Sequence, residues 1–355
     1  MRRLLGVSFL GETRDDVRML LADVVLDGLD RDHWHQFGIA RDRRFAMLCP
    51  LPSTDTFQLQ AAVPAGLEDG EPTPALLQEV VDSVTTGVTV REVVWSSRWR
   101  LNVRMVDRYR VGRVLLAGDA AHVHSPAGAQ GMDTGIQDAA NLGWKLAAVL
   151  GGAEPALLDT YEAERLPVAA DVLGLSTVLS FRPFEDRGPE GERTTQLGVT
   201  YRGGPLAPDA DPGAGPRPGD RAPDAPGHTP AGAPLRLFDL FRAHREAAAP
   251  RPHATLLCFG PVPPVDGPVH AVAVVAPGGP VPAGADAVLV DTGGHARAAY
   301  APTDGELVVV RPDGHVGTRG CDAAVVSGWL RGVLPPVGAL IAHSAARGTM
   351  EGSRP

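Results

Sequence analysis

Residues 113–138 combine residue types that can hold a polar ligand. An apolar run at residues 114–117 ends at Gly118 and Asp119, and a loop with glycine and proline follows. A helix is predicted to begin near Gly131. A carboxylate at a strand end can bind polyol hydroxyls, and free N–H groups at a helix start can stabilise negative charge. The stretch therefore predicts a strand–loop–helix site for a ligand that carries hydroxyls and negative charge.

Short strands and one helix are expected before this stretch. Strands are predicted at residues 21–26, 44–51 and 56–63, and residues 93–106 are predicted to form one long strand or a pair of strands. Apolar residues at helical spacing predict a helix over residues 74–86. Apolar residues alternate with Gln58 and Gln60, so that strand is expected to bury one face and turn the two glutamines to the other. A twisted antiparallel sheet with a helix across it is the expected architecture.

Two long helices are expected after the loop. The first spans residues 131–150, with an apolar stripe formed by Ile136, Ala140, Leu142, Leu146 and Val149. Pro155 opens the second, which runs toward Phe181, and Pro167 is expected to bend or interrupt it. Asp138 and Asn141 are expected to be structural residues of the first helix.

The last third of the chain predicts a separate α/β unit behind a linker. Half of residues 203–234 are glycine or proline, which predicts an extended segment without regular structure. Beyond it, helices are expected at 237–242 and 323–334, and strands at 254–259, 269–275, 287–290, 306–311 and 315–319, the last two joined by a turn at Asp313-Gly314.

Composition narrows the function classes. A net charge of −9 argues against a nucleic-acid surface, and the chain has no apolar run of about 18 residues that would cross a membrane. Cys49, Cys258 and Cys321 are scattered, which is typical of reduced thiols in a cytoplasmic protein.

The motif from Gly118 to Asp138 resembles the Gly-Asp flavin motif of the para-hydroxybenzoate hydroxylase class of FAD monooxygenases. The resemblance continues through residues 141–147 and 158–167. It implies FAD as cofactor and NAD(P)H as reductant. It further implies that Asp119 bonds the ribityl hydroxyls and that a side chain at position 118 would collide with the cofactor. The cofactor-binding residues implied in this way are Gly118, Asp119, Pro126, Gly128, Gly131, Met132 and Asp133.

Residues 22–28, 45–52 and 55–60 resemble the substrate-binding domain of the same class, within its aromatic polyketide and phenol hydroxylase branch. The implied reaction is hydroxylation of a phenolic or polycyclic aromatic substrate through a flavin hydroperoxide. A flat aromatic ligand needs apolar walls with a few polar anchors. The substrate-cavity candidates are Phe57, Gln58, Gln60, Trp95, Arg98 and Arg100. The face that carries Arg98 and Arg100 with Asn102 and Arg104 can equally be a solvated sheet face.

Residues 217–224 resemble the start of the thioredoxin-like domain found in that branch. Pro261 stands where a second cysteine of a redox motif would follow Cys258, so Cys258 is expected to be a buried strand residue. The expected α/β (α+β) chain comprises a substrate-binding domain (1–107), the C-terminal part of an FAD-binding domain (108–182), a linker (183–234), a thioredoxin-like domain (235–345) and a tail (346–355).

No Gly-x-Gly-x-x-Gly unit precedes residue 113, so the chain is expected to lack the N-terminal dinucleotide-binding segment. Either its start is placed too late, or it is a natural fragment or a split partner. The chain alone is expected to bind FAD weakly or not at all. The missing portion, a second copy of the chain and a small aromatic substrate are the expected partners.

No catalytic acid or base is assigned. His122 and His124 have metal-pair spacing, but no further ligand cluster lies nearby in the sequence, so no metal is expected, and His122 is expected to pack and hydrogen-bond near the flavin. The rival hypothesis is a catalytically inactive fragment that serves as an assembly or ligand-binding module.

Overall fold

The structure is a computed structural model that describes residues 1–39, 44–63, 72–180, 188–208, 213–242 and 253–335. The chain divides into two compact units. One is Leu10–Arg104, and the other combines Met1–Phe9 with Met105–Pro355.

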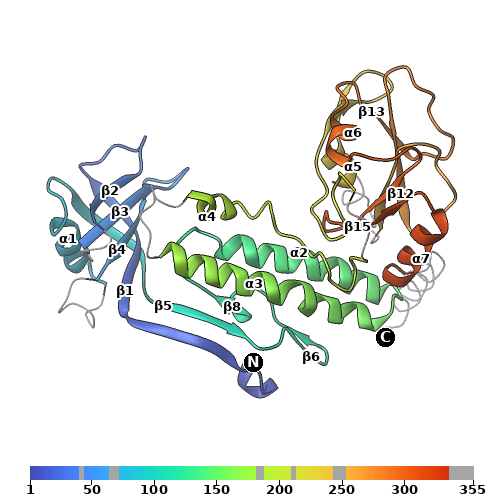
Figure 1. The fold of residues 1–355 in the computed structure, drawn as a ribbon. Helices are drawn as coiled ribbons and strands as arrows, with labels where there is room; N and C mark the ends of the chain where they lie inside the picture. The colour runs from blue at the N-terminus through green and yellow to red at the C-terminus, as the bar shows by residue number, and fades with distance from the viewer. Residues whose placement is uncertain (40–43, 64–71, 181–187, 209–212, 243–252, 336–355) are drawn as a thin grey trace, which may run out of the picture. The chain divides into compact units, whose positions relative to one another are not determined.

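The unit Leu10–Arg104 is built on antiparallel strands in the order β2-β3-β4-β1-β5 (Figure 1). Their bounds are β1 Phe9–Asp27, β2 His35–Ile39, β3 Arg44–Pro50, β4 Phe57–Ala62 and β5 Thr89–Val106. The four predicted strands and the antiparallel sheet are confirmed, and β1 begins well before the predicted residue 21. The hairpin strand β2 was not predicted.

Helix α1 (Pro74–Asp82) covers one face of this sheet. Thr73 caps it by accepting a hydrogen bond from the Leu76 N–H, and proline occupies the first helical position. The core beneath it is formed by Leu20, Ala22, Val24, Leu48, Leu59, Leu77, Val80 and Val81, all at most 1% exposed.

The predicted alternation of β4 is confirmed. Phe57, Leu59 and Ala61 are buried against this core, whereas Gln58 and Gln60 are half-buried on the other face. Strand β1 pairs with β4 in the register Asp23 to Gln58. The side chains of directly paired residues therefore lie on the same face of the sheet, because side chains alternate between the two faces along each strand.

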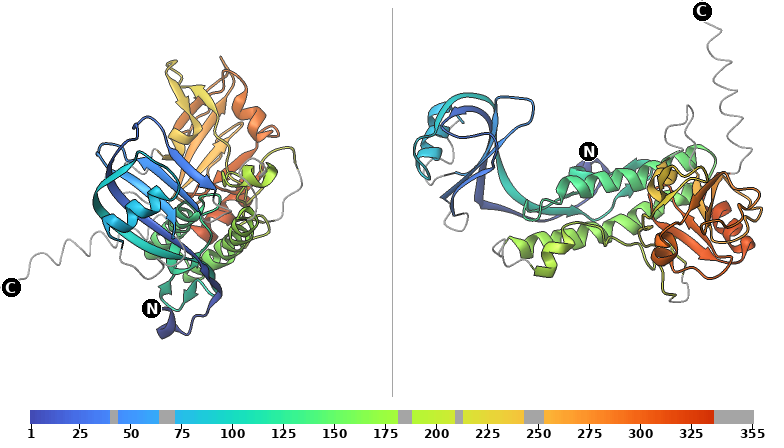
Figure 2. Two further views of the ribbon diagram at one scale, coloured as in Figure 1. Left: turned by 90° about the vertical axis from the view of Figure 1, so that its left-hand side faces the viewer. Right: turned by 90° about the horizontal axis from the view of Figure 1, so that it is seen from above.

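The second unit contains two long helices that lie side by side in all ribbon views (Figure 2). Helix α2 spans Gly131–Leu150, as predicted, and α3 spans Asp159–Leu179 after a 3-10 turn, η4, at Pro155–Leu158. Pro167 lies inside α3, which continues through it. The short elements around them are η1 Arg2–Leu5, β6 Arg110–Val111, β7 Val114–Leu115, η3 Gly118–Ala120, β8 His122–Val123 and α4 Gly188–Arg193.

The apolar stripe predicted for α2 was wrong at Ile136 and Ala140, whereas Leu142 and Val149 pack, partly buried, against the core. Ile136 is 58% exposed and Ala140 is exposed, whereas Asp138, Asn141 and Lys145 are at most 1% exposed. These three polar residues follow the spacing i, i+3, i+7 and therefore share one helix face. Burial of such a face requires charged and hydrogen-bonding partners, which the neighbouring elements supply, as described below.

The C-terminal part of this unit forms a sheet of order β10-β9-β13-β12-β11-β14-β15. Strands β11, β12 and β13 are parallel, and β14 and β15 run antiparallel to their neighbours. The bounds are β9 Pro226–His228, β10 Pro234–Arg236, α5 Leu237–Arg242, β11 Ala254–Cys258, β12 Val269–Val275, β13 Ala287–Val290, α6 His295–Tyr300, β14 Leu307–Val310, β15 Val316–Gly320 and α7 Ala323–Val333. Every strand predicted beyond residue 250 is present, and α6 was not predicted.

The expectation of no regular structure across residues 203–234 was wrong, since β9 and the start of β10 lie there. Both strands begin with proline, where the missing N–H costs the sheet nothing. Ala222 and Ala225 are buried in the core of the sheet, so this segment is an integral part of the C-terminal fold. Cys258 is buried in β11, as predicted, and burial raises the pKa of its thiol to about 12. The thioredoxin-like assignment stays a prediction.

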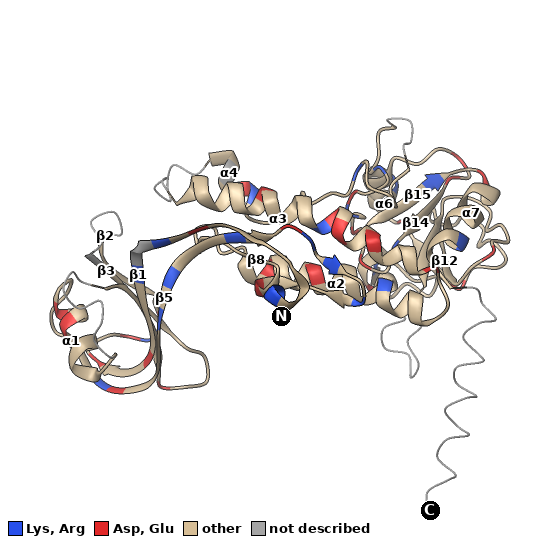
Figure 3. Ribbon diagram, turned by 90° about the horizontal axis from the view of Figure 1, so that it is seen from below, with Lys and Arg blue, Asp and Glu red and all other residues tan. Residues whose placement is uncertain are grey.

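Acidic and basic residues are interspersed along the helices and the C-terminal sheet in Figure 3. Among the described residues, no helix is long and apolar enough to cross a membrane. The same part of the chain holds no group of three or more His, Cys, Asp or Glu placed to hold a metal ion.

Candidate functional site

The predicted Gly-Asp motif forms a tight turn, η3, at the N-terminal side of α2. Gly118 adopts a φ of 55°, a left-handed conformation that disfavours side chains. A Cβ at Gly135 on α2 would lie 3.3 Å from the Gly118 Cα, so turn and helix approach each other as two glycines. Close packing against α2 therefore explains a glycine at position 118, in addition to the cofactor contact that the resemblance implies.

Asp119 is exposed at this turn. Within the described part of the chain, its carboxylate accepts no hydrogen bond and forms no ion pair. A carboxylate with both oxygens open can accept two or more hydroxyl hydrogen bonds from a ligand. The turn thus presents a hydrogen-bond acceptor that no described residue uses.

The loop between β8 and α2 is tightly wound. Gly128 has a φ of 90°, and the next residue, Ala129, has a φ of 53°, which is uncommon for a residue other than glycine. A Cβ at Gly128 would lie 3.0 Å from side-chain atoms of Leu179 and Thr194. Pro126 closes the loop by accepting a hydrogen bond from the Ala129 N–H. Packing against α3 therefore holds the loop in a strained shape.

Helix α2 begins directly after this loop without a side-chain cap at Gln130. Its first turn carries Gly131, Met132 and Asp133, and Met132 is 76% exposed. An uncapped helix start leaves N–H groups available and carries a partial positive charge. Close by, His124 Nε2 is buried without a hydrogen-bond partner in the described structure, and burial lowers the pKa of that imidazole.

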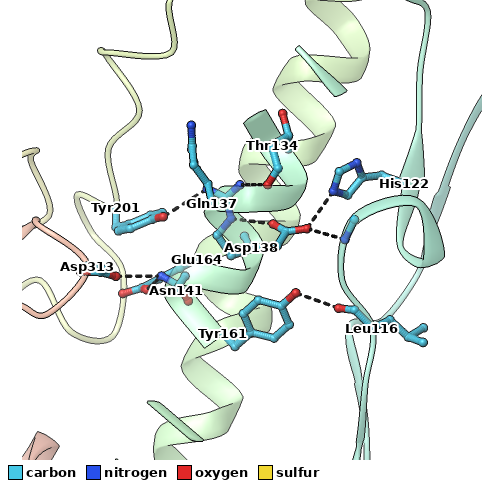
Figure 4. A network of polar contacts seen from close by, with 12 residues as sticks. Leu116, His122, Thr134, Gln137, Asp138, Asn141, Tyr161, Glu164, Tyr201 and Asp313 are labelled. Carbon is cyan, nitrogen blue, oxygen red and sulfur yellow. Dashed lines mark hydrogen bonds and ion pairs between the residues drawn. The ribbon is translucent and has the colours of Figure 1, made fainter. Parts of the chain in front are cut away.

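Asp138 connects the turn to both helices (Figure 4). Its carboxylate accepts hydrogen bonds from the Gly118 N–H (3.0 Å), from His122 Nε2 (2.8 Å) and from Arg165 Nε on α3 (2.7 Å). Burial disfavours its charge, but the His122 hydrogen bond and the Arg165 charge outweigh burial and lower the pKa of Asp138. The ionised carboxylate therefore holds the Gly-Asp turn in place from behind.

Arg165 is equally buried and distributes its donors over several partners. It donates to the Gln137 side chain (3.3 Å), to the Tyr201 hydroxyl (3.1 Å) and to the Thr134 carbonyl (3.1 Å). Tyr161, one helical turn earlier on α3, donates to the carbonyl of Leu116 just before the turn (2.7 Å). Side-chain hydrogen bonds thus connect the strand end, the turn and both helices.

A second buried charge cluster joins α2 and α3 to the C-terminal sheet. Glu164 on α3 accepts two hydrogen bonds from Arg311 (2.7 and 2.8 Å) and one from Lys145 on α2 (2.7 Å). Asp313 accepts from Arg311, from Asn141 and from the Trp144 indole. Despite burial, the Arg311 guanidinium lowers the pKa values of Glu164 and Asp313, and burial lowers the pKa of Lys145 to about 8.

A hollow of about 550 Å³ lies beside the Gly-Asp turn. Leu116 and Ala120 line it together with Arg2, Arg3 and Phe9 from the start of the chain. Arg2 donates to the Ala120 carbonyl (3.0 Å) and stacks over the Phe9 ring at 3.7 Å from its centroid. The arginines Arg2 and Arg3 therefore border the hollow that Leu116 and Ala120 line at the turn.

The substrate-cavity candidates all lie in the other unit. Gln58 and Gln60 are brought together on the open face of the sheet, where Gln60 Nε2 donates to Gln58 Oε1 (2.9 Å). Phe57 lies on the opposite face, in the core under α1, so these three do not line one surface. Trp95 is 49% exposed on β5, and the same strand carries Arg98, half-buried, and Arg100, exposed.

Sequence reasoning assigned Asp138 and Asn141 to the helix but missed their partners. Arg165, Glu164 and Arg311 are distant in sequence, and no single motif joins them. The signal that was present is polar residues at i, i+3, i+7 on α2, a spacing that indicates a buried polar face when partners exist.

Comparison with known proteins identifies the family in which these features occur. Residues 1–176 match the family model described as "FAD binding domain". A flavin-dependent monooxygenase of Mycobacteroides abscessus is 42% identical over 328 residues, 89% of this chain and 61% of the relative. Pentachlorophenol 4-monooxygenase of Sphingobium chlorophenolicum is 35% identical and covers 69% of this chain and 48% of its own length. The chain thus spans about half to three fifths of these curated relatives.

Solved structures that match this chain also include aromatic hydroxylases. Anhydrotetracycline hydroxylase from Streptomyces rimosus matches with a TM-score of 0.65 and 30% identity, covering 94% of this chain and 67% of that one. Aklavinone-11 hydroxylase, solved with FAD and aklavinone, matches with a TM-score of 0.68 and 26% identity, covering 94% and 65%. The predicted α/β fold of the para-hydroxybenzoate hydroxylase type is confirmed, and FAD is the family's cofactor. With its Gly-Asp turn, its uncapped helix start and these matches, the chain belongs to the family of FAD-dependent aromatic hydroxylases.

Proposed function

We propose that this chain acts in an FAD- and NAD(P)H-dependent monooxygenase that hydroxylates a phenolic or polycyclic aromatic substrate. The observation that carries the proposal is the open carboxylate of Asp119, held at a glycine turn beside the uncapped start of α2. Both lie within the residues that match the FAD-binding family model.

The residues of the turn fit a flavin by their chemistry. Asp119 would accept hydrogen bonds from ribityl hydroxyls, and the N–H groups of Gly131, Met132 and Asp133 would face the ring, beside the loop of Pro126 and Gly128. A helix start stabilises nearby negative charge by about 0.3–1 kcal/mol when exposed. Bound FAD supplies acceptance of hydride from NAD(P)H and activation of oxygen. The Asp138 hydrogen bonds keep the turn in position while this chemistry proceeds.

The substrate class rests on the relatives. They include a pentachlorophenol 4-monooxygenase, an anhydrotetracycline hydroxylase and an aklavinone-11 hydroxylase. Pentachlorophenol is a phenol. Gln58 and Gln60 would provide polar anchors on the open sheet face, with Trp95, Arg98 and Arg100 as further contacts. Phe57 would support that face from the core side. The three free cysteines favour a cytoplasmic location.

The test is the Asp119→Ala variant of the full chain, with FAD binding measured by titration over a concentration range wide enough for weak binding. Loss of hydrogen bonds to a charged group costs about 1.5–3 kcal/mol, so affinity should fall roughly 10- to 100-fold. Asp171→Ala is the matched control, because Asp171 is an exposed acid on α3 that pairs with Arg193. Equal FAD affinity of the two variants would contradict the assignment of Asp119.

The reaction itself is tested by NAD(P)H oxidation with a phenolic substrate and by mass spectrometry of the product. A product heavier by one oxygen atom supports the monooxygenase. NAD(P)H oxidation that never yields such a product, across phenols and polycyclic aromatics, would contradict it.

A further inference from the structure

A second cavity, of about 230 Å³, lies between α2 and the C-terminal sheet. Its walls come from α2, from the segment at residues 196–201, from α5 and from the turn between β14 and β15. Figure 4 shows Tyr201, Gln137 and Asn141 on the side of α2 that faces Asp313, away from His122 and Leu116. All of these residues belong to one compact unit.

Two residues that line the cavity carry buried polar atoms that have no hydrogen-bond partner among the described residues. Asn141 is 1% exposed, and its Oδ1 accepts no hydrogen bond from any described residue. His315 is 8% exposed, and neither of its ring nitrogens has a hydrogen-bond partner there, since the nearest approach to Asp313 is 3.6 Å. A buried polar group without a partner is unfavourable, so a ligand that supplies the partner gains binding free energy.

The walls are aromatic. The Tyr201 and His315 rings lie 4.3 Å apart between centroids, and Phe238 and Phe241 lie 5.9 Å apart on α5. All four line the cavity. Aromatic walls of this kind favour a flat ring, because offset and edge-to-face ring pairs are both attractive.

The charge at the cavity is positive. Arg311 is neutralised by Glu164 and Asp313, whereas Arg221 and Arg242 line the cavity, are exposed, and form no side-chain ion pair with a described residue. Guanidinium groups bind carboxylates with paired hydrogen bonds. The cavity is smaller than the range of about 300–1,000 Å³ that is typical of sites for drug-sized ligands, so the ligand is small.

The cavity has a preformed shape. Gln196 lines it with a φ of 55°, a conformation uncommon outside glycine, and is 5% exposed. Its side chain bonds Gln137 (2.6 Å) and Thr134 (3.0 Å), which hold this strained residue in place. Strained residues that the surroundings hold in place cluster at ligand-binding sites.

We propose that this cavity binds a single-ring aromatic carboxylate that carries a hydroxyl group. The carboxylate pairs with Arg221 and Arg242, the ring lies among Tyr201, His315 and the two phenylalanines, and the hydroxyl donates to Asn141 Oδ1. The proposal goes beyond the flavin function and does not depend on it.

The experiment titrates 3-hydroxybenzoate into the full chain by calorimetry, without flavin or nicotinamide. Saturable binding to one site is expected. Benzoate lacks the hydroxyl and 3-hydroxybenzyl alcohol lacks the charge, so each should bind at least about tenfold more weakly, the loss of one good hydrogen bond or ion pair. The His315 imidazole proton resonances, assigned with His315→Gln, should shift during the titration.

The Arg221→Gln/Arg242→Gln double variant should bind 3-hydroxybenzoate at least about tenfold more weakly. Both side chains are exposed, so the fold should survive the change. Arg331→Gln is the control, since Arg331 is an exposed arginine of the same unit that does not line the cavity, and it should bind like the unchanged chain. No saturable binding, equal affinity for the neutral alcohol, or unchanged affinity of the double variant would each overturn the proposal. Because no cofactor is present, such a failure leaves the flavin function standing.

Discussion

Asp138 illustrates how a single buried carboxylate organises this chain. It receives three hydrogen bonds, from a backbone N–H, an imidazole and a guanidinium, and all of its partners lie within 3.0 Å. The exposed residue that we assign to the flavin, Asp119, follows Gly118, whose N–H is one of those donors. The position of the exposed Asp119 carboxylate thus depends on a second, buried carboxylate.

The Asp138→Asn variant should lose about 3–5 kcal/mol of unfolding free energy, because Arg165 would keep a buried charge without its counterion. Urea denaturation measures the loss. The exposed pair of Asp171 and Arg193 gives the comparison: Asp171→Asn should cost no more than about 1 kcal/mol. Similar losses in the two variants would show that Asp138 has no special role.

At the scale of elements, the loop before α2 and α2 itself differ in whether they require glycine. The loop requires positive φ at Gly128 and packs against Leu179 of α3. Helix α2 contains Gly143, which is exposed, has ordinary helical φ and would present a Cβ to open space. The same substitution at the two glycines therefore has opposite expected effects.

Gly128→Ala should destabilise the chain by about 1–2 kcal/mol, the cost of a left-handed conformation for a residue with a Cβ, before any clash is counted. Gly143→Ala should stabilise it by about 0.5–1 kcal/mol, since alanine loses less entropy in a helix. Thermal or chemical unfolding of both variants measures the pair. A shift of the same sign in the two would refute this account of the loop.

At the scale of the whole molecule, buried ion pairs connect the flavin-family helices with the C-terminal sheet. Glu164, Arg311 and Asp313 have fully buried side chains or nearly so. Each charge is compensated by the others, so the helices and the sheet are coupled through a cluster that is costly to break. The C-terminal part is therefore expected to unfold together with the helices.

Because of this cluster, the free energy of unfolding is expected to depend on pH. The folded pKa values of Glu164 and Asp313 lie below their ordinary values of 4.5 and 3.8, so protons bind the unfolded chain first as pH falls. Their contribution is complete above those values and is lost as pH falls through the lower folded pKa values. Unfolding free energy, measured by denaturant at pH 6, 4 and 3, should decline, and Glu164→Gln should decline less steeply. Parallel pH profiles would contradict the role of Glu164.

Local patterns in the sequence determined much of this protein. The span of α2, the alternation of β4, the strands beyond residue 250 and the burial of Cys258 follow from nearest-neighbour periodicity and from glycine and proline signals, which need no knowledge of distant residues. The Gly-Asp turn and its helix were also visible, because a strand, a turn and a helix start are contiguous in the chain.

Only the tertiary structure decided which face of α2 is buried. Apolar periodicity predicted that the face with Ile136 is buried. A polar face can instead be buried because Arg165 and Asp313, which are distant in sequence, pair with Asp138 and Asn141. The same long-range pairing leaves Asn141 Oδ1 and the His315 ring without hydrogen-bond partners among the described residues, in side chains that line a cavity. Charge compensation between residues far apart in sequence is a property of the folded chain, because the pairing energy exists only after burial removes water from both partners.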